Sequence, residues 1–206
     1  MQLAPIFSLS ALALMLLLGG CGTTMPVTET AFLSSYTGLS ETPDGAARQR
    51  RTTLPIDPAS IVIEDPEWRG AMTDADLGER VVLLARLKQT LRTEIGRLPA
   101  ARAARKVRIR SAITRVVPVS PALNTVATLM LIGPVDRGGA AVEIEAIDVD
   151  TGKQLAALNM GYYAPVSDLK ARFATFAPAA LAIDKAASSF APLLFPADAV
   201  APTLVP

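Results

Sequence analysis

Apolar residues recur with the spacing of an α-helix between Thr73 and Leu98, and this periodicity predicts the clearest element of the chain. The predicted buried stripe consists of Leu77, Val81, Leu84, Leu91, Ile95 and Leu98. Acidic residues gather near the start of the segment, where the positive end of the helix dipole stabilises them. Pro99 then ends the helix, because proline cannot continue the backbone hydrogen bonds.

Alternation of apolar and polar residues predicts a half-buried strand over residues 106–117. Val107, Ile109, Ser111 and Ile113 fall on one face, and arginine, alanine and threonine fall on the other.

Residues 138–165 have the pattern of a β-hairpin whose turn is the sequence "DTGK". Glu143 and Glu145 are expected to face solvent, and the apolar residues that alternate with them are expected to face the core. The alternation slips at Ala146 and Ile147, which predicts a bulge.

Three further segments are less regular. A short strand is predicted at Ile61–Ile63, and the prolines on both sides favour an edge position. Residues 120–134 suit either a helix or a buried strand, and we predict a helix. A last helix is predicted from Ser167 to Phe190, kinked or divided by Pro178.

The resulting order, strand–helix–strand–helix–strand–strand–helix, predicts an α+β fold with a small mixed or antiparallel sheet and helices packed mainly on one face. A single globular domain is expected over residues 54–191. Residues 21–53 are predicted to be a tether and a docking segment, and residues 192–206 an extended, loosely held, proline-rich tail. The residues expected to dock are Phe32, Leu33, Tyr36 and Leu39.

The N-terminal run Ile6–Leu18 contains no charged residue. As a helix it would extend ~20 Å, short of the ~30 Å hydrocarbon core of a bilayer, so a stable transmembrane helix is disfavoured. The run has the length of the apolar region of a signal peptide, and residues 1–20 are interpreted as one. The alternative is a buried apolar helix with an incidental free cysteine.

The residues that follow, "LGGC", resemble the lipobox of bacterial lipoproteins, which ends in an invariant cysteine. The resemblance implies that Cys21 is lipidated and becomes the first residue of the mature protein in a Gram-negative cell. Gly22 follows where an aspartate would retain a lipoprotein at the inner membrane. We therefore expect an outer-membrane lipoprotein that faces the periplasm, because several acyl chains make attachment effectively permanent.

The composition removes most of the familiar catalytic groups. The chain has no histidine and one cysteine, which excludes Ser/His/Asp and Cys/His catalytic sets, an intrachain disulfide and cysteine-based metal clusters. The formal net charge is +1, too small for the overall field to attract a polyanion. The sequence thus predicts no cofactor, no metal site and no nucleic-acid partner.

Four acidic residues lie close together in the predicted hairpin: Glu143, Glu145, Asp148 and Asp150. Such a group is compatible with a calcium site or an acid–base pair, but the ligand spacing of a calcium loop is missing. We favour a solvated hairpin face with a polar turn.

A basic run extends from Arg97 to Arg115 without an acidic residue. Guanidinium groups bind phosphate in bidentate fashion, so the run is a candidate site for anionic envelope ligands such as phospholipid or lipopolysaccharide headgroups. The candidate contacts are Arg102, Arg105, Lys106, Arg108 and Arg110. The alternative is an exposed face whose charges pair with acids elsewhere in the fold.

Trp68, Tyr162 and Tyr163 suit either a binding surface or the rim of the core. We favour the rim of the core.

Four stretches of sequence carry a family resemblance: "FLSSY", "IDPASIVI", "KVRIRSAIT" and "NTVATLMLIGPVDRGGAAVEIEAIDVDTGKQLAAL". They are similar to the bacterial lipoproteins grouped as domain of unknown function 3313, over residues Phe32 to Phe190. The most specific part runs from Gly138 to Gly152. The resemblance implies a family without assigned catalytic residues, so it transfers no site.

The sequence favours a non-enzymatic lipoprotein that acts as an envelope interaction or assembly module, with membrane contact through Cys21 and envelope proteins as partners. One alternative is a module that binds anionic ligands through the arginine-rich strand. A second is a carboxylate-dependent hydrolase that uses Glu143, Glu145 or Asp148, which would have to converge in a pocket.

Overall fold

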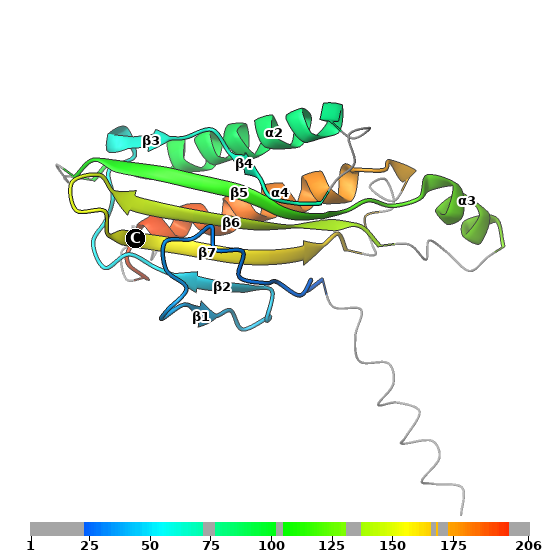
Figure 1. Ribbon diagram of the computed structural model, residues 1–206, viewed down its shortest axis with the longest axis horizontal. Coiled ribbons are helices and arrows are strands. Elements are labelled where there is room, and N and C mark those ends of the chain that lie inside the picture. Colours follow the sequence, from blue (N-terminus) through cyan, green and yellow to red (C-terminus); the bar gives the residue numbers. More distant parts are fainter. Residues whose placement is uncertain are drawn as a thin grey trace, which may run out of the picture.

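The computed structural model describes residues 23–71, 77–101, 105–130, 137–165, 168 and 173–197. Its centre is a seven-stranded sheet in the order β1-β2-β7-β6-β5-β3, with β4 also paired to β5 (Figure 1). The strands are β1 (Ser40–Glu41), β2 (Ala47–Arg50), β3 (Ile61–Ile63), β4 (Glu67–Trp68), β5 (Val107–Val117), β6 (Gly139–Asp148) and β7 (Gln154–Tyr163). The helices are α2 (Leu77–Gly96), α3 (Pro121–Leu129) and α4 (Ala177–Phe190), with short 3₁₀ helices η2 (Pro58–Ser60) and η5 (Ala191–Leu194).

The sheet is mixed. Strands β5, β6 and β7 form long antiparallel pairs, β2 adds to β7 in the antiparallel sense, and β3 and β4 lie parallel to β5. The α+β class and the mixed sheet are therefore confirmed, and β3 occupies the edge that its flanking prolines favour.

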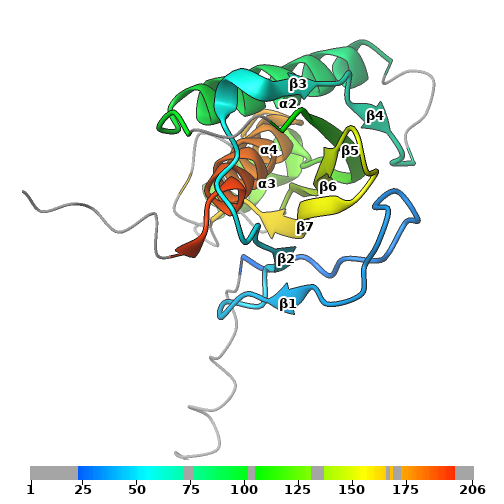
Figure 2. The same cartoon turned by 90° about the vertical axis from the view of Figure 1, so that its left-hand side faces the viewer.

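Helices cover one face of the sheet. Helix α4 packs on β6 and β7, and α2 packs on α4. Figure 2 shows α4 inside the curve of the sheet and the chain that precedes β1 on the outer side. The core between helices and sheet includes Val142, Ile144 and Leu158 from the strands, and Ile183 and Phe190 from α4. Within the described residues, no helix is both long enough and apolar enough to cross a membrane.

The buried stripe of α2 differs from the predicted one. The buried residues are Leu83, Leu87, Leu91 and Ile95, whereas Leu77 and Val81 are exposed. Positions 81 to 84 are all apolar, so spacing alone does not decide which of them faces the core. The series with four-residue spacing is the one buried in the structure.

The predicted hairpin forms, and its register shifts between Ala146 and Ile147, where the bulge was expected. The expectation that Glu143 and Glu145 face solvent is wrong, because both are completely buried. They lie on the face opposite α4, and residues 30–36 cover them.

The chain packs onto the sheet earlier than a tether would. Met25 is buried, and its N–H donates to the carbonyl oxygen of Gly161 at 3.0 Å. Strands β1 and β2 then extend the sheet beyond β7. Their sequences carry no apolar alternation, and they were not predicted.

The C-terminal part also differs from expectation. Helix α4 begins at Ala177 with Pro178 in its first turn, where the missing N–H has no helical partner to lose, so proline starts this helix instead of kinking it. The predicted cap Ser167 lies outside the described residues. The expected loose tail is wrong for its first residues, because Leu193 and Leu194 are buried and their carbonyls accept backbone hydrogen bonds.

Candidate functional site

A charged layer lies on the outer face of the sheet, opposite the helices. Residues paired directly across neighbouring strands share a face, and the pairs Arg110–Glu145 and Ala112–Glu143 place arginine and glutamate in adjacent rows. Both glutamates are completely buried. A buried carboxylate is stable only when hydrogen bonds replace the water that it has lost, so its partners define the site.

Glu145 is fully occupied by hydrogen bonds. One carboxylate oxygen accepts from the backbone N–H and the hydroxyl of Ser34 at 2.8 and 2.7 Å, and from the amide of Gln154 at 2.8 Å. The other oxygen accepts from the Arg110 guanidinium at 2.9 Å. The side chain therefore joins β5, β7 and the N-terminal segment in one ion-paired contact.

Glu143 is held by the same segment. Its carboxylate accepts from the Tyr36 hydroxyl at 2.9 and 3.0 Å and from the Thr30 hydroxyl at 2.6 Å. The Tyr36 oxygen in turn accepts from the backbone N–H groups of Thr30, Phe32 and Leu33 at 3.2 to 3.3 Å. Tyr36 thus organises the loop that covers the glutamates.

Burial shifts the pKa values of Glu143 and Tyr36. Burial raises the pKa of Glu143 above its ordinary value, although hydrogen bonds from Thr30 and Tyr36 favour the charged form. Burial also raises the pKa of Tyr36, and the adjacent Glu143 carboxylate acts in the same direction. Tyr36 therefore stays protonated and able to donate.

An aromatic ring closes the layer. Phe32 is buried, with Arg110 at 4.6 Å and Arg69 at 5.3 Å from its ring centre. Leu33, Tyr36 and Leu39 pack in the same small cluster, so docking of the predicted residues is confirmed. Cation–π contact and burial together hold residues 30–39 on the sheet. We call this arrangement, Thr30 to Tyr36 over Glu143 and Glu145, the docking network.

The carboxylates of the docking network are occupied by protein donors. The carboxylates of Glu143 and Glu145 already accept from protein donors at every oxygen, and neither lines a groove described below. Asp148 lies at the hairpin turn and has a different role from that of Glu143 and Glu145. Its carboxylate accepts from backbone N–H groups, chiefly that of Thr151, which lowers its pKa. Among the described residues, no group of three or more candidate ligands is placed to hold a metal ion.

Most of the described candidate contacts in the basic run are paired with acids. Arg102 lies outside the described residues. Arg105 pairs with Asp148 at 3.0 Å and Arg108 with Glu64 at 3.5 Å. Arg110 pairs with Glu145 and, at 3.6 Å, with Glu67, whereas Lys106 is exposed. Distant acids therefore neutralise three members of the run, as its alternative interpretation expects.

One basic groove nevertheless contains Arg105. It has a volume of about 660 Å³ and lies beside the β6–β7 turn. Arg50, Arg51 and Lys153 line it together with Arg105, and Asp148 is its acidic residue. Sequence reasoning missed three of these cations, because they lie far from the basic run along the chain.

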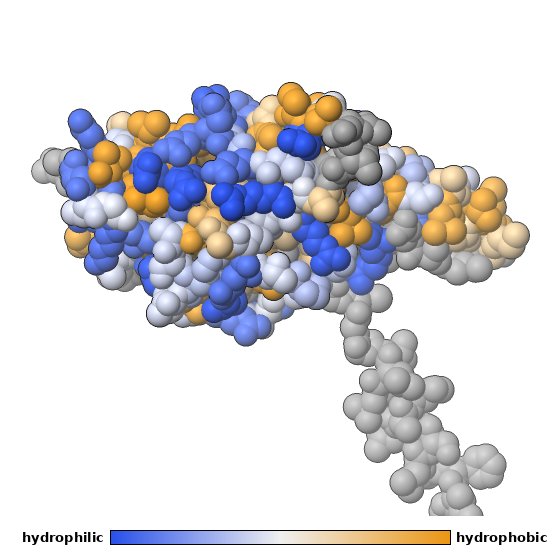
Figure 3. All heavy atoms as spheres, in the orientation of Figure 1, coloured by the Kyte–Doolittle hydropathy of each residue, from blue (hydrophilic) through white to orange (hydrophobic). Residues whose placement is uncertain are grey.

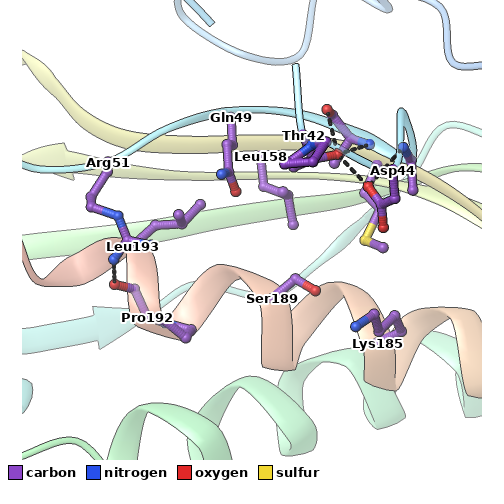
Figure 4. Close-up of a pocket in the computed structure, with 13 residues that line it drawn as sticks. Thr42, Asp44, Gln49, Arg51, Leu158, Lys185, Ser189, Pro192 and Leu193 are labelled. Atoms are coloured by element: carbon purple, nitrogen blue, oxygen red, sulfur yellow. Dashed lines mark hydrogen bonds between the residues drawn. The ribbon is translucent and has the colours of Figure 1, made fainter. Parts of the chain in front are cut away.

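A second groove, of about 440 Å³, separates β2 from α4 (Figure 4). Ser189 of α4 lies across it from Gln49, Lys185 of α4 lies on the side of Asp44, and Leu158 lies at its floor. At one end Arg51 donates to the carbonyl oxygen of Pro192, which ties β2 to η5. The groove combines an apolar floor with a polar rim.

Two further predicted features can be placed. Trp68 and Tyr162 are partly buried against the core, as expected for residues at its rim. Cys21, the predicted lipidation site, lies outside the described residues, two positions before the first of them.

Fold and site together define a small α+β domain in which residues 30–36 pack on a buried pair of glutamates. The chain belongs to the family described as Protein of unknown function (DUF3313), whose model matches residues 28–190. That match includes the whole docking network. No curated protein matches the sequence.

Two solved structures are similar to the chain at low identity. A PelC dodecamer from Paraburkholderia phytofirmans matches with 12% identity and a TM-score of 0.44, over 72% of this chain and 95% of that one. A variant of that dodecamer, with one leucine replaced by methionine, matches with 11% identity, the same TM-score and the same coverage.

Proposed function

We propose that the protein is a non-enzymatic lipoprotein, anchored through Cys21 in the outer membrane and facing the periplasm, which acts as an interaction or assembly module of the envelope. The docking network is the observation that supports this proposal. It fixes the segment that follows Cys21 instead of leaving it free, and it uses the two buried glutamates of the outer face for that purpose.

A short link between anchor and domain has a mechanical consequence. Thr23 accepts a hydrogen bond from the Tyr163 N–H at 2.7 Å, and Cys21 precedes it by two residues. Two residues extend at most ~7 Å, so a lipid on Cys21 would hold the domain against the membrane surface. Such a module presents its partners with a defined orientation, which suits assembly better than capture by a flexible tether.

The anchor is tested by following the chain in cells supplied with a labelled fatty acid. The expected result is a labelled mature protein that begins at Cys21 and sediments with outer membranes. Cys21→Ser should give an unlabelled precursor. The matched control combines Cys21→Ser with Ser40→Cys, which restores a thiol on exposed β1 and should remain unlabelled. Normal processing of Cys21→Ser would refute the anchor.

Localisation is tested by Gly22→Asp, which introduces the residue that, by family analogy, retains lipoproteins at the inner membrane. The variant should move from the outer-membrane to the inner-membrane fraction. If the unsubstituted protein already fractionates with the inner membrane, the outer-membrane assignment is wrong although the anchor stands. Crosslinking of the lipidated protein in intact envelopes then identifies its partners.

The basic groove supports a second candidate function, the binding of an anionic envelope ligand. Four cations and one acid line it, and each guanidinium has five donors, more than its protein partners use. Lys153→Gln should weaken binding of inorganic phosphate or anionic vesicles, and more so at low salt. Lys106→Gln is the matched control, because Lys106 is an exposed neighbour that does not line the groove. Equal binding by both variants would remove this candidate.

A further inference from the structure

Helix α3 exposes an apolar face at one end of the molecule. Leu129 and Met130 are 78% and 69% exposed, and Leu123 and Val126 are also exposed. In Figure 1 the helix projects beyond the ends of β5 and β6, and in Figure 3 its surface is largely hydrophobic. The opposite side of the helix, which includes Ala127, is buried.

The hydroxyl groups of α3 and of its N-cap are hydrogen-bonded to the backbone of the helix. The hydroxyls of Thr125 and Thr128 donate to the carbonyl four residues earlier, at 2.8 and 2.7 Å. The Ser120 hydroxyl caps the first turn by accepting from the Leu123 N–H at 3.3 Å. The sequence from Val116 to Val135 contains no charged residue. This face therefore offers little to water and suits an apolar medium.

The exposed helix lies at the same end of the sheet as the start of the described chain. Val117, Gly139 and Tyr163 are paired in one row across β5, β6 and β7, and Tyr163 is hydrogen-bonded to Thr23. Three strand spacings of ~4.8 Å therefore separate Thr23 from Val117, the last residue of β5 before α3, about 15 Å in all. A lipid on Cys21 would enter the membrane near this helix.

Phe173 adds to the apolar end. It is exposed, and it lies two residues before Thr175, whose carbonyl accepts from the Val119 N–H at 3.0 Å just ahead of α3. By contrast, the exposed residue Val62 belongs to β3, which pairs with the opposite end of β5.

We propose that α3 seats its apolar face in the headgroup–acyl boundary of the bilayer that holds the lipid on Cys21. This inference rests on the proposed anchor. The nine residues of α3 extend ~14 Å, less than half of the hydrocarbon thickness, so the helix lies in the interface and does not span it. The anchor and α3 together make two contacts, which fix the tilt of the domain on the membrane.

The test uses the full lipidated protein with an environment-sensitive fluorophore on a single introduced thiol. Lipidation consumes the thiol of Cys21, so Leu129→Cys provides a unique attachment site on α3. Val62→Cys is the matched control, a 64% exposed position of β3 beside the other end of β5. Both proteins are reconstituted into phosphatidylethanolamine–phosphatidylglycerol vesicles with a quencher attached to the lipid headgroup or upper acyl chain.

At position 129 we expect a blue shift and loss of about half of the emission, because an interfacial helix inserts its apolar face ~5–10 Å. At position 62 the emission should stay as in water. Lipidated protein without quenching at position 129 overturns the seating of α3 and leaves the anchor intact. A blue shift that depends on protein density and resists the lipid quencher assigns the face to a second copy, and also overturns it. If the protein purified from cells carries no fatty acid and position 129 is still quenched, the anchor is wrong and the seating of α3 stands.

Discussion

Removal of the Tyr36 hydroxyl is the sharpest test of the docking network. Tyr36→Phe keeps the ring but deletes a donor to the buried Glu143 carboxylate and an acceptor for the three backbone N–H groups. A hydrogen bond to a charged group contributes about 1.5–3 kcal/mol and a neutral one about 1. A hydroxyl oxygen accepts at most two bonds, and those at 3.2 to 3.3 Å are long, so about 3 kcal/mol is expected in all.

This loss is limited by the free energy of docking, because the segment can detach once docking becomes unfavourable. Hydrogen exchange of the Phe32, Leu33 and Ser34 amides measures the docking equilibrium directly. Chemical denaturation measures the remaining change in the free energy of unfolding. Tyr163→Phe is the matched control, a half-buried tyrosine outside the docking network, and it should change stability by less than ~0.5 kcal/mol. Unchanged amide protection in Tyr36→Phe would refute the assigned role of the hydroxyl.

Three further predictions concern charge, core and backbone. Burial raises the pKa of Glu143, so the folded protein binds the proton of this carboxyl more tightly than the unfolded chain does. The stability gained from that proton is complete below the ordinary pKa of glutamate and is lost as the pH rises through the raised value. Glu143→Gln should lack this decline in denaturation curves. Leu87→Ala should lower the free energy of unfolding by about 2–5 kcal/mol, whereas Val81→Ala, on the exposed face of α2, should change it by less than ~0.5. A Cβ on Gly161 would overlap the carbonyl oxygen of Met25, so Gly161→Ala should release the first described residues to proteolysis while native circular dichroism persists.

The long elements of the fold follow from periodicity, and the short ones do not. The alternation in β5, β6 and β7 and the helical spacing in α2 are strong because each element has many residues against the core. Strands β1 and β2 have two and four residues and little apolar surface, so their pairing is decided by β7 and not by their own sequence. The register shift beside Ala146 was predicted from the alternation, although the residue without a partner, Leu155, lies on β7.

The candidate site was only half predictable, because its parts are distant in sequence. Phe32 and Tyr36 mark a docking segment by their apolar surface. Alternation alone, however, assigns Glu143 and Glu145 to solvent, since the cover comes from residues more than a hundred positions earlier. The same holds for Arg110, whose acidic partners lie on two other strands.

The polar character of the docking network explains its specificity better than its strength. If residues 30–36 detach, Glu143 and Glu145 regain water, so the hydrogen bonds made on docking are largely exchanged for hydration. Net attraction comes instead from burial of Phe32 and Leu33, at about 25 cal/mol per Å² of apolar surface. A segment shifted by one residue would bury the same kind of apolar surface but leave Glu143 without its donors and Glu145 with only Arg110 and Gln154. The network thus selects one register for the segment that leads from the start of the described chain to β1.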